Sequence, residues 1–219
     1  EAIAMTDHGT LSGVIEFYKA AKARNIKPII GMETYVAARK HTDKEPGKDK
    51  PNFHLILLAM NNTGYKNLMR LSTTANLEGD YYKPRLDHEL LEKYNEGLIV
   101  LSACIGGEVG DAIRNEQYDE ARRIAEWYKG VFGDRYYIEV QDHGHPTHQS
   151  KWDEQVTVNK GLKKLATELG IQMVVTCDAH YLTHEDQEAH EILLCVQTGS
   201  FLDETTRMSL KEFELHVTD

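Results

Sequence analysis

The sequence predicts an α/β protein, and among α/β folds it favours a (β/α) barrel. Apolar runs of strand length alternate about six times with segments of helical periodicity, and no long section contains strands alone. No GxGxxG or GKS/GKT phosphate loop follows a predicted strand, so a nucleotide-binding doubly wound fold lacks its usual motif. Polar residues with metal-ligand chemistry recur where predicted strands end, as expected at the mouth of a barrel.

The predicted elements follow one another regularly. Predicted strands cover residues 2–5, 27–31, 53–59, 98–102, 136–140 and 172–176. Helical periodicity predicts helices at about 12–24, 65–72, 118–131, 148–169 and 189–196. Their apolar faces carry Val14, Phe17, Tyr18 and Ala21; Tyr65, Leu68, Met69 and Ser72; Ala121, Ile124, Ala125 and Tyr128; and Ala189, Ile192, Leu193 and Val196. The composition of residues 39–52 and their lack of periodicity predict a solvated, mobile loop. Residues 78–85 are expected to be irregular.

Composition limits the class of protein. A chain of 219 residues with 41% hydrophobic content suits one domain with a sizeable core. Three cysteines without CxxC spacing argue against a disulfide framework or a structural zinc knuckle. No apolar run approaches the roughly 20 residues that span a bilayer, and no signal pattern opens the chain. We therefore expect a cytoplasmic protein with no membrane partner.

The net charge of −10 argues against a general electrostatic grip on nucleic acid. Any DNA has to be held locally. Three bound dications would add about +6 within one cleft and reverse its local sign.

The run from residue 172 to residue 182 organises the rest of the chain. It begins as a buried-looking strand, and Asp178 and His180 follow the strand two residues apart. If the extended geometry continues, both side chains leave the same face and can bind one metal ion. The alternative is that Asp178 caps the next helix and His180 is a hydrogen-bonded, partly buried histidine.

Four further residues are candidates for the same site. His8, Glu33 and Cys104 each follow a predicted strand, so a barrel would bring them to one mouth. His54 begins its strand, where a histidine is more often structural than ligating. Cys104 has an alternative role as a small apolar residue, because a thiol becomes a ligand only beside a cation.

The remaining histidines have simpler explanations. His143, His145 and His148 surround a Gly and a Pro, which predicts a turn with exposed histidines rather than a ligand group. No role is assigned to the histidines in polar or helical contexts: His41, His88, His184, His190 and His216.

Taken together, the motifs at residues 6–9, 31–36, 54–59, 101–104 and 177–182 resemble the metal motifs of the polymerase and histidinol phosphatase (PHP) family. The segments at 62–68, 141–144 and 189–199 are similar to the PHP domain of the bacterial DNA polymerase III alpha subunit. The resemblance implies a distorted (β/α)7 barrel with up to three divalent metal ions, namely zinc, manganese or iron. On this resemblance the metal ligands are His8, Glu33, His54, Cys104, Asp178 and His180.

One family motif is missing from this sequence. The His-x-His pair of the family's first strand is absent, so we expect a fragment that lacks the first strand and helix and that binds metal weakly or not at all on its own. Residues 1–200 would form the PHP domain, and residues 201–219 would begin the connection towards a polymerase palm.

The function implied by the resemblance is that of a piece of the replicative DNA-directed DNA polymerase. The PHP domain itself would be a metal-dependent 3′-5′ exonuclease for proofreading, with a metal-bound water rather than a side chain as nucleophile. Its partners would be DNA, through the full-length polymerase, and other replisome subunits. Two alternatives are a catalytically silent scaffold and a stand-alone phosphoesterase such as a histidinol phosphatase.

Overall fold

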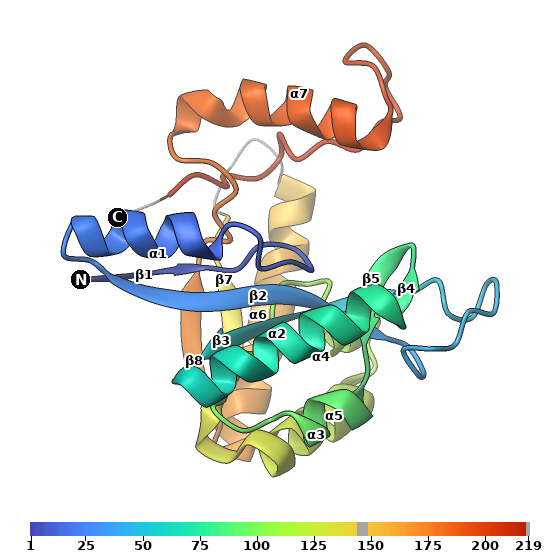
Figure 1. The fold of residues 1–219 in the computed structure, drawn as a ribbon. Helices are drawn as coiled ribbons and strands as arrows, with labels where there is room; N and C mark the ends of the chain where they lie inside the picture. The colour runs from blue at the N-terminus through green and yellow to red at the C-terminus, as the bar shows by residue number, and fades with distance from the viewer. Residues whose placement is uncertain (144–148, 218–219) are drawn as a thin grey trace.

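The computed structural model describes residues 1–143 and 149–217 and shows a curled, half-barrel sheet with helices packed against it (Figure 1). The strands are β1 Ala2–Met5, β2 Lys27–Ala37, β3 Asn52–Ala59, β4 Asp80–Tyr81, β5 Lys83–Leu86, β6 Leu98–Leu101, β7 Tyr136–Gln141 and β8 Gln172–Thr176. Seven of the eight strands lie in the order β4-β5-β2-β3-β6-β7-β8, and the eighth, β1, pairs with the first half of β2.

Four of the seven strand pairs in the described part of the chain are parallel. The antiparallel pairs are the β4–β5 pair and the two pairs formed by β3. Strand β3 runs antiparallel to both β2 and β6, whereas β6, β7 and β8 are parallel to one another. The segment between β2 and β3 contains no helix, and a direct connection of this kind reverses the strand direction. The sheet is therefore mixed rather than wholly parallel.

The helices are α1 Val14–Ala23, α2 Asn62–Leu77, α3 His88–Lys93, α4 Glu108–Arg114, α5 Tyr118–Phe132, α6 Gln149–Leu169 and α7 Gln187–Thr198. In α5 the predicted inward face is confirmed, because Ala121, Ile124, Ala125 and Tyr128 are all buried. Among the described residues, no helix is long and apolar enough to cross a membrane.

The hydrophobic core lies between the sheet and helices α2, α4, α5 and α6. Leu57, Val100 and Ile138 come from three neighbouring strands and are fully buried against these helices. A smaller apolar cluster, centred on Ile56 and Leu101, occupies the other, inner face of the strands. Since side chains alternate along a strand, polar residues in register with this second set are directed to the inner face.

Several sequence-based expectations were wrong at the surface. Tyr18 and Met69 are exposed rather than inward-facing, and β8 is partly exposed, with Val175 71% accessible. On α7 the predicted apolar face is exposed as well, whereas Glu191, Leu194 and Cys195 are buried. Strand β8 is paired on one side only, at the end of the strand order, which explains why its apolar residues are not enclosed.

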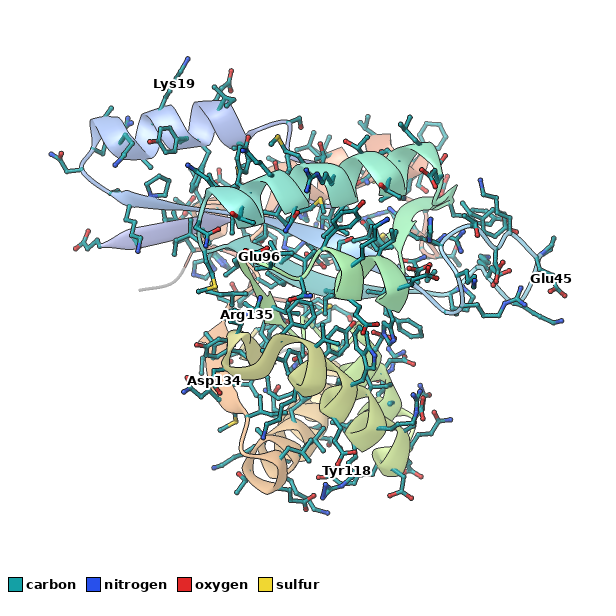
Figure 2. The ribbon with its side chains drawn as sticks, turned by 60° about the horizontal axis from the view of Figure 1, so that its bottom comes forward. Lys19, Glu45, Glu96, Tyr118, Asp134 and Arg135 are labelled. Atoms are coloured by element: carbon teal, nitrogen blue, oxygen red, sulfur yellow. The ribbon has the colours of Figure 1, made fainter. Side chains whose placement is uncertain are left out.

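Two segments predicted as irregular are ordered by one arginine. Residues 80–86 form the β4–β5 hairpin rather than irregular structure. The buried Arg85 guanidinium donates to the carbonyl oxygens of His41, Asp43 and Asp49. The loop between β2 and β3 is therefore not fully solvated, although Glu45 lies at its outer tip (Figure 2).

The chain after α7 folds back along that helix. The buried carboxylate of Glu191 accepts hydrogen bonds from Arg207 Nη1 at 2.6 Å, Ser209 Oγ at 2.8 Å and the Leu210 backbone N–H at 2.7 Å. These three contacts fix the C-terminal segment, residues 199–217, beside the inner face of the sheet.

Candidate metal centre

One pocket of about 230 Å³ gathers all the candidate ligands. It is lined by His8, Glu33, His54, Cys104, Asp178 and His180. The C-terminal segment supplies its apolar wall through Met208, Leu210, Phe213 and Leu215. A second pocket of about 480 Å³, beside α3 and α5, is lined by one histidine, His88, and by several carboxylates. Among the described residues, these side chains do not form a group of three converging donor atoms.

Glu33 lies in the middle of β2 and not in a loop after it, as the sequence had suggested. Strand β2 continues to Ala37 because its second half pairs with β3. Glu33 is 4% exposed, and its backbone also holds the preceding turn in place. Its N–H donates to the Asp7 carbonyl at 3.1 Å, and its own carbonyl accepts from the Gly9 N–H at 2.8 Å. This pairing carries His8 into the pocket, with Nδ1 3.6 Å from Glu33 Oε2.

Three donor atoms converge around Glu33. His54 Nδ1 lies 2.5 Å from Glu33 Oε1, and Cys104 Sγ lies 3.5 Å from the same nitrogen. The three ligand-type atoms all lie within 4.8 Å of one another. His54 is fixed by its backbone N–H, which donates to the Gly106 carbonyl at 3.0 Å.

The pKa shifts of Glu33 and His54 both favour the charged forms of these two side chains. Burial alone would raise the pKa of Glu33, but the hydrogen bond with His54 and the nearby charge of His8 outweigh it and lower the pKa. Burial alone would lower the pKa of His54, but its bonds with Cys104 and Glu33 raise that pKa to about 10. The cluster therefore favours a cation at its centre.

Asp178 and His180 reach the pocket by a different geometry from the predicted one. Asp178 has a φ of 49°, so the backbone turns here and the extended conformation of β8 does not continue. The turn leaves Asp178 Oδ1 3.9 Å from His180 Nδ1. Burial and the charge of Glu33 raise the pKa of Asp178. The cap of the following 3-10 helix is Thr183, so the alternative role of Asp178 as that cap is excluded.

Left-handed backbone occurs beside both loop ligands. Ala103, immediately before Cys104, has a φ of 62°, and Asp178 itself is left-handed. This conformation costs a non-glycine residue roughly 1–2 kcal/mol. Two such residues, one in the pocket and one next to a pocket residue, indicate that the surrounding structure imposes the direction of the ligand side chains.

His143 was expected in an exposed turn, and this expectation was wrong. It is 6% exposed and lines the pocket. A buried polar row leads to it along β7: Glu139 Oε1 accepts from Gln141 Nε2 at 3.2 Å, and Gln141 Oε1 lies 2.9 Å from His143 Nε2. His145 and His148 lie outside the described residues.

This polar row was not predicted, although its spacing is visible in the sequence. Glu139, Gln141 and His143 are spaced by two, which in a strand directs all three to one face. The apolar wall left no comparable signal, because residues 201–217 have no regular periodicity.

The donor set fits a divalent metal ion. A carboxylate oxygen of Glu33, a ring nitrogen of His54 and the thiol sulfur of Cys104 lie within 4.8 Å of one another, so one cation between them could be bound by all three. Mixed oxygen, nitrogen and sulfur donors suit transition ions rather than magnesium or calcium. The role of all six residues as ligands remains a prediction.

A curled α/β sheet with this group of donors on its inner face is consistent with the PHP family implied by the motifs, and the family assignment is confirmed. Residues 1–143 match the family described as the PHP domain, which is more than half of the chain. This chain belongs to the PHP domain family.

Within the family, the chain is similar to DNA polymerase III alpha subunits. It is 46% identical over 218 residues to the DNA polymerase III subunit alpha of Thermus aquaticus, covering 99% of this chain and 17% of that protein. It is 43% identical over 216 residues to the same subunit of Borreliella burgdorferi, covering 98% of this chain and 18% of that protein. The chain thus spans under a fifth of the length of these relatives.

A crystal structure described as that of a candidate metal-dependent phosphoesterase from Bifidobacterium adolescentis also aligns with the fold. The alignment covers 80% of this chain and 75% of that chain, with 10% identity and a TM-score of 0.30. Similarity at this level adds nothing to the family assignment.

Proposed function

We propose that this chain is the PHP domain of a DNA polymerase III alpha subunit and that its pocket is a metal-dependent 3′-5′ exonuclease site for proofreading. The observation that carries the proposal is the convergence of six donor residues, from separate parts of the sequence, on one pocket. The similarity to alpha subunits over nearly the whole chain supports the polymerase context.

Two groups of residues would hold the ions. Glu33, His54 and Cys104 form the tighter group, and His8, Asp178 and His180 lie across the same pocket. On the family resemblance the ions would be zinc, manganese or iron, with up to three in the complete site, and the mixed carboxylate, imidazole and thiol donors suit several such ions. When bound, divalent ions supply Lewis-acid polarisation of a phosphodiester and acidify water to near-neutral pKa.

The protein's own residues prepare the site for this chemistry. The buried Glu33 carboxylate and its histidine partners fix the positions of the donors before any ligand arrives. The apolar side chains of the C-terminal segment limit the access of bulk water on one side, which strengthens electrostatic interactions inside the pocket. Because the chain carries a net charge of −10, bound cations would also be needed to admit a phosphate.

The proposal extends to the surroundings of the domain. We propose that DNA is engaged through the full-length polymerase, that other replisome subunits are partners and that the protein is cytoplasmic. The division into a PHP domain at residues 1–200 and a connecting segment from 201 is also proposed. Residues 208–215 contribute to the pocket, so the two parts would act together.

The test is the substitution Asp178→Asn in the full-length polymerase, with Asp203→Asn as the matched control because Asp203 is exposed and lies outside the pocket. Excision of a mismatched 3′ nucleotide and primer extension are measured for each variant. We expect Asp178→Asn to lose excision and keep extension, and Asp203→Asn to keep both.

A scaffold role predicts a different outcome. Excision would then be absent from the wild-type polymerase, or unchanged by Asp178→Asn. Either result would contradict the exonuclease proposal while leaving the family assignment intact.

A further inference from the structure

A second group of metal-type donors lies outside the pocket. His184 belongs to the 3-10 helix His184–Asp186, and Glu214 and His216 belong to the C-terminal segment. Their ligand-type atoms all lie within 4.8 Å of one another, and none of the three residues lines the pocket.

The local backbone explains why these residues meet. His216 pairs with Tyr181 in a parallel bridge, and the Val217 N–H donates to the Tyr181 carbonyl at 3.2 Å. Residues two apart in such an extended segment share a face. Glu214 and His216 therefore lie together facing His184, whereas Leu215 between them is 3% exposed and turns towards the pocket.

The distances fit a metal ion. His184 Nδ1 lies 2.9 Å and His216 Nδ1 lies 3.3 Å from the same oxygen, Glu214 Oε2. A tetrahedral zinc ion with bonds of about 2.0–2.1 Å holds its donors about 3.3 Å apart. The observed separations are close to this value, and the two imidazole rings are oriented edge to face at 84°.

Ordinary hydrogen bonding leaves one of these atoms unsatisfied. His216 Nδ1 is buried and has no hydrogen-bond partner among the described residues, despite its distance of 3.3 Å from the carboxylate. A ring nitrogen that is near a carboxylate oxygen but unsuitably oriented for an N–H···O bond can present its lone pair to a cation instead. This is an observation separate from the clustering of the three residues.

We propose that His184, Glu214 and His216 bind a divalent transition ion, zinc in preference to magnesium or calcium, which fastens the C-terminal segment to the turn after β8. Two imidazoles and one carboxylate are a donor set that selects such ions. Three protein ligands leave a fourth position for water.

The consequence of binding would reach the pocket through the backbone. The His180 N–H donates to the Leu215 carbonyl at 2.7 Å, so the same segment contacts a pocket residue directly. An ion at the second site would hold the apolar pocket wall in place. The proposal does not depend on exonuclease activity, because it concerns binding and local order alone.

The first measurement is zinc stoichiometry in the 219-residue chain, by equilibrium dialysis followed by elemental analysis. Glu214→Gln and His216→Ala are compared with the wild type and with Glu185→Gln, a control that makes the same charge change on an exposed neighbour of His184. We expect one equivalent of zinc to be lost in the two cluster variants and retained in the control. Asp178→Asn should also retain it, which separates this site from the pocket.

The second measurement is the rate of trypsin cleavage after Arg207 and Lys211, with and without zinc. At free zinc ten times the dissociation constant, mass action predicts about tenfold protection in the wild type and in Glu185→Gln. The cluster variants should show no zinc-dependent protection, and this comparison within each variant is independent of any change in basal folding. Undiminished stoichiometry in Glu214→Gln and His216→Ala, or equal protection in all variants, would overturn the proposal.

Discussion

Glu139 shows at the residue scale how the polar row behind the pocket affects stability. Its side chain is 3% exposed, and burial raises its pKa to about 7 although Thr176 and Gln141 donate hydrogen bonds to it. The ordinary value is 4.5, so between these pH values the folded protein binds more protons than the unfolded chain. Protonated Glu139 therefore makes its full contribution to the free energy of unfolding below pH about 4.5, and this contribution is lost as the pH rises through about 7.

We predict that Glu139→Gln removes this dependence. In metal-free buffer, the free energy of unfolding of the wild type should fall by about 3 kcal/mol relative to that of the variant between acidic and mildly alkaline pH. The reason is that each unit of pKa shift corresponds to about 1.4 kcal/mol. Urea unfolding at pH 4.5 and pH 8 measures the difference. Glu96→Gln is the control, since Glu96 is exposed. A wild-type-to-variant difference that does not change with pH would contradict the prediction.

At the same scale, residue type was enough to select the candidate ligands, but local geometry was not predictable. His8, Glu33 and Cys104 were identified from their positions near strand ends, and they do line one pocket. Asp178 was expected in extended backbone, but its left-handed φ depends on tertiary contacts that periodicity does not encode. His143 was misjudged because its burial depends on packing against the distant Phe213.

At the element scale, the contact between the start of α2 and the loop before β6 depends on two glycines. A Cβ on Gly64 would lie 1.8 Å from the Gly97 carbonyl oxygen, and Gly97 itself has a φ of +72°. Gly130, inside α5, has open space around an added Cβ. Gly64 and Gly130 both lie in helices, so Gly130 serves as the control for a substitution at Gly64.

We predict opposite effects for the two alanine substitutions. Gly64→Ala forces backbone apart and should destabilise the protein by about 3 kcal/mol or more. Gly130→Ala should stabilise it by about 0.5–1 kcal/mol, because alanine has the higher helix propensity and meets no obstacle. Urea unfolding of both variants measures these changes. Equal effects of the two substitutions would contradict the close approach between the start of α2 and the loop before β6.

The elements themselves were largely predictable from periodicity, because strands and helices differ in their repeat. Six predicted strands and five predicted helices correspond to observed elements, with changes mainly at their ends. Strand direction was not predictable in the same way, since an alternating pattern is identical in both directions. The antiparallel β3 and the β4–β5 hairpin follow from connections and from the contacts of Arg85, which no local pattern contains.

At the scale of the whole molecule, the pocket depends on the return of the chain after α7. Glu191 is 1% exposed and forms a buried ion pair with Arg207. Removing one member of such a pair leaves the other charge without its partner and typically costs 3–5 kcal/mol. The cost should fall mainly on the C-terminal segment, which has no regular secondary structure of its own.

We predict that Glu191→Ala detaches residues 199–217 while the sheet and its core remain folded. Trypsin cleavage after Arg207 and Lys211 should accelerate, while far-UV circular dichroism changes little. Glu188→Ala, on the exposed part of α7, is the control. Cleavage at the wild-type rate in Glu191→Ala would mean that the segment is held by other contacts.

Anomalous X-ray diffraction from crystals of the full-length polymerase, grown with manganese or zinc, shows whether the donors of the pocket bind metal. We expect anomalous density inside the pocket, within bonding distance of at least three of its six candidate ligands, including Glu33 and His54. Crystals that contain the added ion but show no anomalous density between these side chains would show that the six residues do not form a metal centre.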